Sequence, residues 1–391
     1  MAVRVVVLGG GRVGGAIVRD LAKLEGWDVS VADVSEAVLE RLAARTGART
    51  IHADLADAQA VKRAVRGADL VIGAVPGFMG FATVEAVIDA GTNMVDISFF
   101  PEDPFQLDAV AKQRGVTVVV DCGVAPGCDN IILGYHDTRL SRIDRFTCMV
   151  GGLPVARYWP YEYRSVFSPV DVIEEYTRPA RVVEHGRHIV RPALSGIELV
   201  DVPGVGTLEA FDTDGLRSLL TTMPHIPFMK EKTLRYPGHA DRMRMLRETG
   251  FFSREPIDVG GTRIAPFSLT AHLLFEAWRL PPGEEDMTVM RIEIAGDLDG
   301  RPVHILSMLV DRYDRDTGTT SMARTTGYTC TAGARAVAEG LFREPGVWAP
   351  ERLGAVPGVY EFVMQHLAER GVIFDISETF GDGDAEGATG E

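Results

Sequence analysis

The first 14 residues constrain the fold of this 391-residue chain more than any other segment. Residues Val3–Leu8 are mostly β-branched and apolar, which predicts a short buried strand. Gly9, Gly11 and Gly14 follow with the spacing Gly-x-Gly-x-x-Gly, and residues 16–21 continue in a helical pattern. A strand, a glycine-rich turn and a helix in this order are typical of domains that bind a dinucleotide. A glycine-rich loop in another doubly wound fold is the alternative interpretation.

Each glycine has a steric role in a dinucleotide site. Gly9 permits the tight turn, Gly11 lets the backbone approach a pyrophosphate, and Gly14 lets the helix close on the strand. The first turn of the helix contains Arg12 and Val13, and it presents unpaired N–H groups and the positive end of the helix dipole to the phosphates. All of these residues are therefore predicted to bind the cofactor.

An acidic residue selects between the two nicotinamide dinucleotides. Asp33 lies 19 residues after Gly14, at the end of the second predicted strand, where a carboxylate accepts the ribose hydroxyls. A carboxylate at this place repels the extra phosphate of NADP, and the following Val34 and Ser35 supply no arginine to bind it. The sequence therefore predicts NAD as the cofactor.

Strands and helices alternate through the first third of the chain. Strands are expected over residues 3–8, 28–32, 49–52, 69–75, 93–97 and 116–121, and helices over residues 35–46, 57–66, 81–90 and 104–114. Apolar strands that alternate with helices imply a parallel sheet covered on both faces. The predicted fold class is α/β, with a Rossmann doubly wound parallel sheet in the order 3-2-1-4-5-6.

Residues that follow these strands should face the cofactor, because ligands bind at the carboxyl ends of the strands in open α/β sheets. On this basis Asp54 and Leu55 flank the adenine, although Asp54 is equally consistent with a helix cap. Val75 and Pro76 line the route to the nicotinamide. Four strand-end residues are expected nearer the reacting centre: Asp96, Ser98, Asp121 and Cys122.

Composition excludes several classes of function. The formal net charge is −15, and a protein that binds nucleic acid non-specifically needs a basic face. No apolar run approaches the roughly 18–20 residues of a membrane span, and the chain enters its first strand without a basic leader. The four cysteines have no Cys-x-x-Cys pair and no metal-like spacing with histidine, so we expect free thiols and no metal. These features predict a cytoplasmic enzyme that acts on a small molecule. We also expect the chain to assemble as a homo-oligomer, a dimer or a tetramer.

The pattern changes after Cys122. Stretches with β character are residues 143–150, 161–167, 181–190, 197–202, 207–211, 287–294 and 302–312, with turn signals at His185-Gly186 and Asp299-Gly300; the clearest helices are residues 214–222 and 239–248. We therefore predict a dinucleotide-binding domain over residues 1–122 and an α+β domain over residues 123–327 with a mixed or antiparallel sheet. The later domain would serve substrate binding and oligomerisation. Helices over residues 328–377 should return to the first domain, and residues 378–391 form an acidic, disordered tail.

Several later stretches carry a family resemblance. The run Gly-Val-Ala-Pro-Gly-Cys-Asp-Asn at residues 123–130 and the Gly-Gly-Leu-Pro turn at residues 151–154 resemble the saccharopine dehydrogenase (reductase-type) superfamily. Within it, residues 167–181, 206–217 and 229–239 look most like L-lysine 6-dehydrogenase. The resemblance implies NAD-dependent oxidation of the ε-amine of L-lysine to allysine, which cyclises to piperideine-6-carboxylate, with release of ammonia.

Two departures bear on the substrate. The reductases usually carry an aspartate before the Pro-Gly of the interdomain run, where this chain has Ala125, and an arginine after their Ser-Pro element, where it has Val170-Asp171-Val172. Both differences count against a tricarboxylic substrate. The alternatives are a saccharopine or carboxynorspermidine reductase that acts on a secondary amine, and a catalytically silent NAD-binding protein.

Lysine carries one carboxylate and two ammonium groups, and each needs a partner of opposite charge. Arg235 is predicted to hold the carboxylate through its guanidinium fork, with a surface arginine at a strand end as the alternative. Glu209 and Asp214 are candidates for the α-ammonium. Tyr236 is expected to position water or the amine, and Cys122 to line the pocket.

Oxidation of an amine also requires a proton acceptor. His239 is the first candidate, because it begins a helix whose dipole favours the neutral imidazole. Asp96 and Asp121 are the second and third candidates. A purely structural histidine and two loop-capping aspartates are the alternatives.

Overall fold

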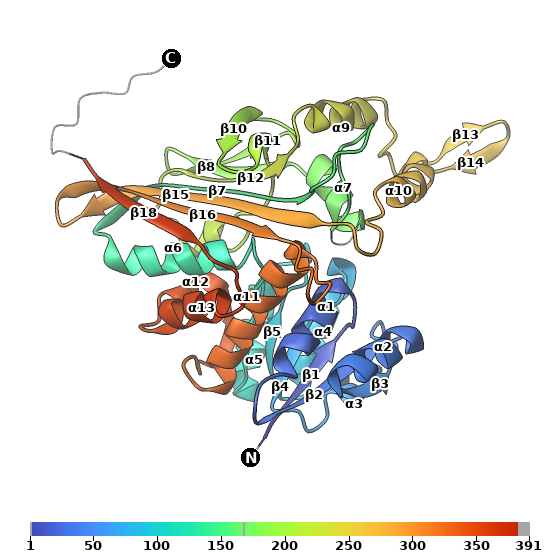
Figure 1. The fold of residues 1–391 in the computed structure, drawn as a ribbon, viewed down its shortest axis with the longest axis vertical. Helices are drawn as coiled ribbons and strands as arrows, with labels where there is room; N and C mark the ends of the chain where they lie inside the picture. The colour runs from blue at the N-terminus through green and yellow to red at the C-terminus, as the bar shows by residue number, and fades with distance from the viewer. Residues whose placement is uncertain (1, 167–168, 382–391) are drawn as a thin grey trace.

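Two sheets organise the molecule (Figure 1). The computed structural model describes residues 2–166 and 169–381. Phe167 and Ser168 of the family-like stretch and residues 382–391 of the predicted tail lie outside the described residues. Within the described part, no helix is long and apolar enough to cross a membrane.

The N-terminal sheet is parallel throughout and has seven strands. Its order is β17-β6-β5-β4-β1-β2-β3, which confirms the predicted doubly wound arrangement and adds one edge strand. The strands are β1 (Val3–Leu8), β2 (Trp27–Asp33), β3 (Arg49–His52), β4 (Leu70–Gly73), β5 (Asn93–Asp96), β6 (Thr117–Val119) and β17 (Gly346–Trp348). The added strand β17 comes from the C-terminal part of the chain and was not predicted, because three residues carry too little periodicity to be recognised.

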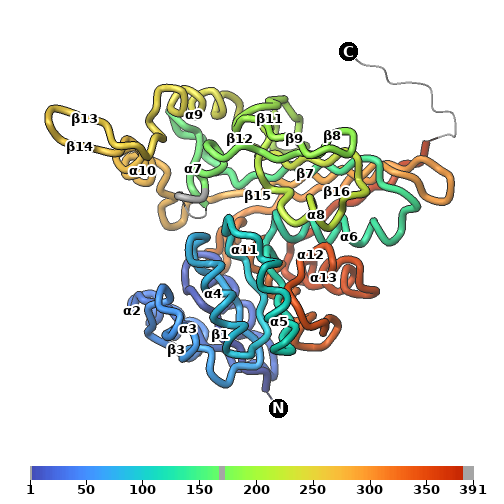
Figure 2. The backbone as a smooth tube through the Cα atoms, turned by 180° about the vertical axis from the view of Figure 1, so that it is seen from behind, coloured from blue at the N-terminus to red at the C-terminus, as the bar shows by residue number. Residues whose placement is uncertain are grey.

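Helices cover both faces of this sheet, as the buried strands require. On one face α1 (Arg12–Leu21), α2 (Glu36–Thr46) and α11 (Ser321–Ala338) pack on the sheet (Figure 1). On the other face lie α3 (Ala58–Ala64), α4 (Gly77–Asp89) and α5 (Asp108–Arg114), which are in front in Figure 2. The predicted N-cap Ser35 accepts a hydrogen bond from the backbone N–H of Val38.

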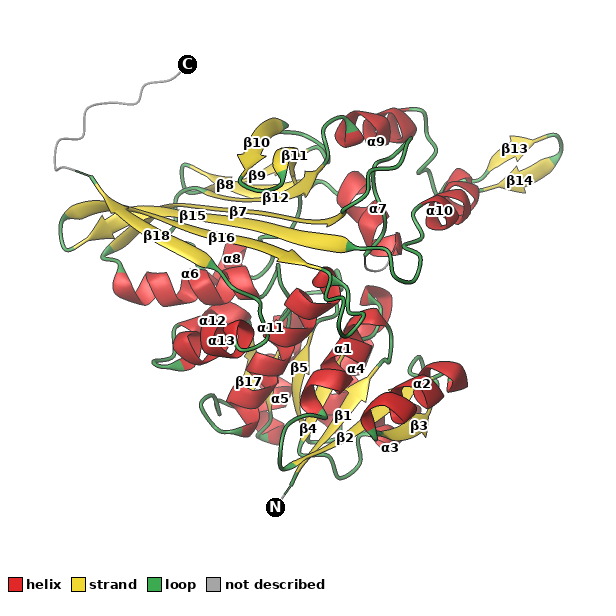
Figure 3. Cartoon of the chain, in the orientation of Figure 1, coloured by secondary structure: helices red, strands yellow, loops and turns green. Residues whose placement is uncertain are grey.

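The second sheet is mixed and has nine strands. Its main path is β10-β11-β12-β7-β15-β16-β18, and the hairpin β8–β9 branches from β12 (Figure 3). The strands are β7 (Arg142–Pro154), β8 (Ala180–Glu184), β9 (Arg187–Arg191), β10 (Glu198–Val202), β11 (Gly206–Asp212), β12 (Met229–Arg235), β15 (Asp286–Leu298), β16 (Arg301–Arg312) and β18 (Asp375–Phe380). A separate hairpin of β13 (Ile257–Val259) and β14 (Thr262–Ile264) projects from the body (Figure 3).

Several expectations for the second domain need correction. Residues 161–166 are loop apart from one isolated bridge at Ser165, and the helix expected over residues 214–222 is reduced to α8 (Leu219–Thr222). Strand β12 was not predicted, because four of its seven residues are charged, three of them although they are buried, and no apolar alternation remains. Among the described residues of this domain, three helices were also missed: α6 (Cys128–Arg139), α7 (Pro169–Thr177) and α10 (Pro266–Ala277). Helix α12 (Pro350–Gly354) lies in the C-terminal stretch for which helices were predicted.

The C-terminal part of the chain joins both sheets. Helix α11 packs against α1 of the N-terminal sheet, and α13 (Val359–Ala368) packs against α11. The expectation of an unstructured tail from Glu378 is wrong at its start, because residues 378–380 belong to β18 and pair with β16. That pairing satisfies backbone groups that a polar tail would otherwise leave to water.

Candidate active site between the two sheets

A cavity of about 790 Å³ lies where the carboxyl ends of the parallel strands meet the second sheet. Its N-terminal wall contains the cofactor residues expected from the sequence, namely Gly9, Gly11, Arg12, Val13, Gly14, Asp33, Asp54, Leu55, Val75 and Pro76. Its other wall comes from β7, α7, β12 and the loop after β11. One cavity therefore receives groups from both parts of the chain, with room for a dinucleotide and a small substrate.

The glycine-rich turn has the shape that a pyrophosphate needs. Gly9 has a φ of +102°, and a Cβ there would lie 2.4 Å from the carbonyl oxygen of Ala74. A Cβ on Gly14 would lie 1.9 Å from the carbonyl oxygen of Gly9. A Cβ on Gly11 would meet nothing within 4 Å, so the backbone is open to the cavity at this point. These residues fit a dinucleotide at the N-terminus of α1.

The end of the cavity at Asp33 and Asp54, where the ribose of a dinucleotide is expected and which we call the ribose end, is acidic. Asp33 accepts hydrogen bonds from the backbone N–H of Gly10 at 2.7 Å and of Ser35 at 2.8 Å, which fixes its carboxylate beside the glycine-rich turn. Asp54 lines the same end and accepts a hydrogen bond from the N–H of Ala56 at 3.0 Å, whereas the N-cap of α3 is Asp57. Arg12 lines the cavity but donates to the carbonyl oxygens of two residues across the interface, Ser165 and Leu280.

Strand β12 presents every second residue to the cavity. Glu231, Thr233 and Arg235 all line it, as the twofold alternation of a strand requires. Arg235 is buried and accessible from the cavity, so the placement predicted for it is compatible with a substrate anchor. Glu231 is also buried, and sequence reasoning missed it because the strand itself was not recognised.

A chain of hydrogen bonds holds Arg235 in place. Its Nε donates to the hydroxyl of Tyr176 at 3.3 Å, and its outer nitrogens donate to Glu175 at 2.5 Å and to the carbonyl oxygen of Leu234 at 2.9 Å. Its guanidinium also lies over the ring of Tyr163, 4.6 Å from the centroid. The guanidinium therefore has one fixed orientation toward the cavity.

His239 stands behind this arginine and does not line the cavity. Its Nδ1 lies 2.9 Å from the carbonyl oxygen of Tyr161, which can only accept, so Nδ1 carries the proton. Its Nε2 then accepts from the hydroxyl of Tyr176 at 3.0 Å. Burial lowers the pKa of His239 to about 3, and the charge of Arg235 adds to this effect. We therefore do not retain His239 as the base, because its lone pair is engaged and no substrate can reach it.

Two further predicted residues lie outside the cavity and have structural contacts. Tyr236 donates its hydroxyl to the carbonyl oxygen of Pro154 at 2.8 Å. Glu209 accepts from the backbone N–H of Gly238 at 2.9 Å and of Ala240 at 2.5 Å, and thereby caps the first turn of α9 (His239–Glu248). The sequence shows that both residues are polar and lie near the family-like turn. It does not show that their side chains are already hydrogen-bonded to backbone groups.

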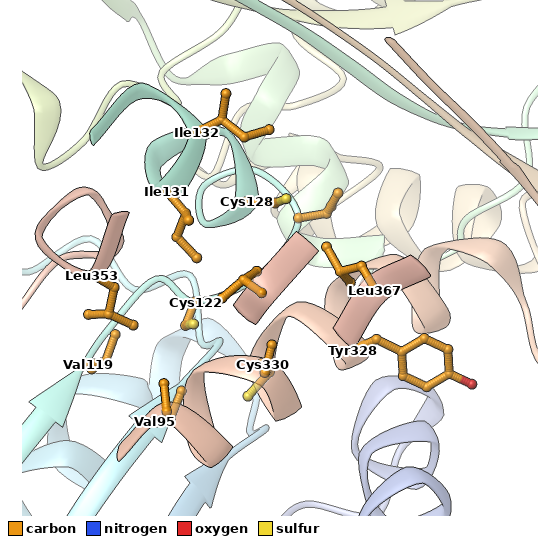
Figure 4. Close-up of a cluster of buried hydrophobic side chains, with 14 of the residues drawn as sticks. Val95, Val119, Cys122, Cys128, Ile131, Ile132, Tyr328, Cys330, Leu353 and Leu367 are labelled. Carbon is orange, nitrogen blue, oxygen red and sulfur yellow. The ribbon is translucent and has the colours of Figure 1, made fainter. Parts of the chain in front are cut away.

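Asp96 and Cys122 are also placed differently from the expectation. Asp96 is fully buried and accepts from both the N–H and the hydroxyl of Ser98, each at 2.9 Å, while Ser98 itself lines the cavity. Cys122 packs in the core with Cys128 and Cys330 (Figure 4), and burial raises the pKa of its thiol to about 12. Neither residue lines the cavity, so neither is retained as a contact of the substrate.

Asp121 lines the cavity as predicted and forms an ion pair across the interface. Its Oδ2 accepts from Nε of Arg217 at 2.8 Å, and Arg217 also donates to the carbonyl oxygen of Phe100 at 2.8 Å. Both partners of this pair adopt left-handed backbone conformations, with φ of +53° and +46°. The second oxygen of Asp121, Oδ1, is buried without a hydrogen-bond partner among the described residues.

The remaining charged residues of the substrate end come from α7 and the loop after β11. Asp214 lines the cavity as expected, but Arg181 binds both of its oxygens, at 2.7 and 2.9 Å. Glu174, Glu175 and Arg178 line it as well. The sequence placed these three in a family-like stretch without assigning them a role, and the signal available was the run of charged residues itself.

Two family models match the chain and together cover most of it. The Saccharopine dehydrogenase NADP binding domain matches residues 5–119, and the Saccharopine dehydrogenase C-terminal domain matches residues 123–372. Among the described residues, no group of histidine, cysteine, aspartate and glutamate side chains is arranged to hold a metal ion.

Two distant relatives extend over nearly the whole chain. The NADP(+), L-glutamate-forming saccharopine dehydrogenase of Saccharomyces cerevisiae is 22% identical over 448 residues, covering 95% of this chain and 98% of the relative. The mitochondrial alpha-aminoadipic semialdehyde synthase of Mus musculus is 20% identical, covering 96% of this chain. The chain spans 48% of the length of that synthase and 29% of its Rattus norvegicus counterpart.

A solved structure shares the fold. Apo saccharopine dehydrogenase (L-Glu forming) from Saccharomyces cerevisiae superposes with a TM-score of 0.79 at 20% identity, covering 96% of this chain and 99% of that one. The arrangement of a parallel dinucleotide-type sheet beside a larger mixed sheet is therefore common to both proteins.

Proposed function

This chain belongs to the saccharopine dehydrogenase family, and on that premise we propose that it oxidises the ε-amine of L-lysine with NAD. The reaction consumes the lysine ε-ammonium form, NAD⁺ and water, and it yields allysine, NADH, ammonium and one proton. NAD is proposed against the NADP named for the family model and for the yeast relative.

The observation that carries the substrate proposal is the charge of the substrate end of the cavity. Five carboxylates line it, namely Asp121, Glu174, Glu175, Asp214 and Glu231, against two arginines, Arg178 and Arg235. Arginines engage the first four of these carboxylates, which leaves Glu231 without an ion-pair partner among the described residues. Lysine has two ammonium groups and one carboxylate, so it can supply a cation to that carboxylate. Saccharopine has three carboxylates and two amines, and its net negative charge would be repelled.

The choice of NAD rests on the ribose end. Asp33 lies at the end of β2 and lines the cavity beside Val34 and Asp54. The arginines that line the described part of the cavity are Arg12, Arg178 and Arg235, and Arg12 is bonded to carbonyl oxygens across the interface. A 2′-phosphate would therefore meet carboxylates at this end without a cation to neutralise it.

Under this proposal, each group of residues has a separate role in binding. The turn at Gly9–Gly14 and the N-terminus of α1 would hold the pyrophosphate, and the bound dinucleotide would accept the hydride. Arg235, held rigid by its hydrogen bonds, would bind the substrate carboxylate and fix the distance of the reacting carbon from the cofactor. The carboxylates that line the substrate end of the cavity would stabilise the two ammonium groups of lysine.

A saccharopine-type secondary amine is the second candidate. Two arginines, Arg178 and Arg235, line the cavity and would allow two carboxylate anchors, and the relatives named above support this reading. A screen for formation of NADH and NADPH with lysine, ornithine, saccharopine and diamines at mildly alkaline pH separates the candidates. NADH formed with lysine and not with saccharopine is the expected result, and the opposite pattern contradicts the proposal.

A further inference from the structure

Glu231 differs from the other carboxylates of the cavity wall in its partners. Four of the five are paired with an arginine: Asp121 with Arg217, Glu174 with Arg178 and Arg254, Glu175 with Arg235, and Asp214 with Arg181. Glu231 has no ion-pair partner among the described residues, and its Oε2 is buried without a hydrogen bond. A buried, unpartnered carboxylate oxygen in a cavity wall costs free energy unless a ligand supplies the missing partner.

The loop after β11 restricts the conformation of the Glu231 side chain. A Cβ on Gly215 would lie 1.3 Å from Oε2 of Glu231, so the carboxylate packs directly on the backbone of the loop after β11. The backbone N–H of Thr213 in the same loop donates to the carbonyl oxygen of Glu231 at 3.0 Å. The side chain is therefore fixed between this loop and the cavity.

We propose that Glu231 binds the ε-ammonium group of the substrate and accepts its proton, at the opposite end of the site from Arg235. This assignment rests on the proposed function. The proton passes from the substrate nitrogen to the carboxylate of Glu231 and leaves a neutral amine, whose carbon can then release a hydride to the bound dinucleotide.

The spacing along β12 agrees with the length of lysine. Glu231 and Arg235 are four residues apart on one face of the strand, which places their Cα atoms about 13 Å apart. An extended lysine measures about 7 Å from its carboxylate to its ε-nitrogen, and a hydrogen bond of about 2.9 Å at each end brings the span to about 13 Å. Ornithine is one methylene shorter and cannot engage both groups fully.

The charges that face Glu231 favour its role as a proton acceptor at alkaline pH. Burial raises the pKa of Glu231 well above its usual range, and Asp129, Glu175 and Asp214 add to this effect while Arg217 opposes it. The thiol of Cys148 also faces it, and burial raises the pKa of that thiol well above its usual range. An arriving ammonium group stabilises the charged form of Glu231, and the carboxylate then takes the proton.

The test compares two ligands in the presence of NADH, which prevents turnover. L-lysine and L-norleucine differ in the ε-amine, so the ratio of their dissociation constants, measured by quenching of NADH fluorescence, isolates the contact with that group. The unaltered protein should bind lysine about 10–100-fold more tightly, as for a hydrogen bond to a charged group. In Glu231→Gln this ratio should fall to near one, with the affinity for NADH unchanged.

A matched control and a second variant separate binding from folding. Glu293→Gln alters a glutamate of β15 that is paired with Arg291 and does not line the cavity, so its ratio should match that of the unaltered protein. Glu231→Asp keeps the negative charge on a side chain that is one methylene shorter. It should therefore retain part of the preference for lysine over norleucine. The acid limb of the pH profile of kcat/KM should be present in Glu231→Asp and lost in Glu231→Gln.

The outcomes distinguish this assignment from the proposed function. If the unaltered protein neither binds nor oxidises lysine, the proposed function is wrong and this assignment fails with it. If the unaltered protein oxidises lysine and Glu231→Gln keeps the full preference for lysine over norleucine, the proposed function stands and Glu231 is not the amine-binding residue.

Discussion

Arg217 and Asp121 form an ion pair that joins the loop after β11 to the end of β6, with 2.8 Å between Nε and Oδ2. Both side chains are buried, at 7% and 3% exposed. Loss of the arginine leaves an uncompensated carboxylate between the two domains. We expect Arg217→Met to lower the free energy of unfolding by about 3–5 kcal/mol, measured by urea denaturation.

The exposed pair of Arg4 and Asp69 provides the control for this prediction. Its side chains are 55% and 46% exposed, so Arg4→Met should lower the free energy of unfolding far less than Arg217→Met does. Adding Asp121→Asn to Arg217→Met should recover part of the lost stability, because no buried charge then lacks a partner. If Arg217→Met and Arg4→Met lower the free energy of unfolding equally, the ion pair between the two domains does not contribute significantly to stability.

The cofactor preference should depend on Asp33. We expect the unaltered protein to have a higher kcat/KM with NAD than with NADP, and Asp33→Asn to narrow the difference by removing the charge that opposes a 2′-phosphate. Steady-state kinetics with both cofactors measures it, and Asp57→Asn is the control, because Asp57 caps α3 and does not line the cavity. A higher efficiency with NADP in the unaltered protein contradicts the proposal of NAD.

Arg235 should determine recognition of the substrate carboxylate. Arg235→Lys keeps the charge but loses the fork that holds a carboxylate through two hydrogen bonds, so KM for lysine should rise about 10–100-fold while the affinity for NAD stays the same. Cadaverine, which is lysine without its carboxylate, should be a poor substrate of the unaltered protein. The anchor is misassigned if cadaverine and lysine react equally well.

His239 should position Arg235 through Tyr176 and take no part in proton transfer. In His239→Asn, the amide can still donate to the carbonyl of Tyr161 in place of Nδ1, but it is too short to replace Nε2 as the acceptor for Tyr176. The pH profile of kcat should therefore keep its shape while KM rises modestly. A loss of kcat of about 10²–10⁴-fold, with the acid limb removed, would restore His239 as the base.

The same histidine predicts how stability depends on pH. Burial lowers its pKa to about 3, against about 6.5 in an unfolded chain. Between these values the unfolded state binds the proton and the folded state does not, so the free energy of unfolding falls as the pH falls from about 6.5 toward 3. His239→Asn should lose less stability over this window than the unaltered protein, as measured by urea denaturation at several pH values.

Local sequence patterns were sufficient for the dinucleotide domain. The glycine turn after β1, Asp33 at the end of β2 and the order of the first six strands were predicted from local patterns, whereas the edge strand β17 was not. The substrate end could not be derived in this way, because several candidate polar groups are used by backbone atoms distant in the chain. Glu209 caps α9 and Tyr236 bonds Pro154, and neither contact leaves a signal in the sequence.

Strand β12 illustrates the same limit. Its residues alternate correctly, but the side chains turned to the cavity include a glutamate and an arginine in place of apolar residues. An apolar periodicity therefore cannot identify a strand that is buried because it faces a ligand site. Glu231 was missed for this reason, whereas Arg235 was found through its family-like neighbours.

The pairing of β17 with β6 has a consequence for biosynthesis. Thr117 pairs with Gly346, 229 positions later, so the edge of the N-terminal sheet stays open while the whole second domain is being translated. At about 5–20 residues per second the delay is roughly 10–50 s. During that time a nascent chain carries an unsatisfied strand edge, which is a template for association with other chains. Chaperone demand in the cell should therefore be greatest before residues 346–348 leave the ribosome, and a fragment that ends near residue 122 should aggregate.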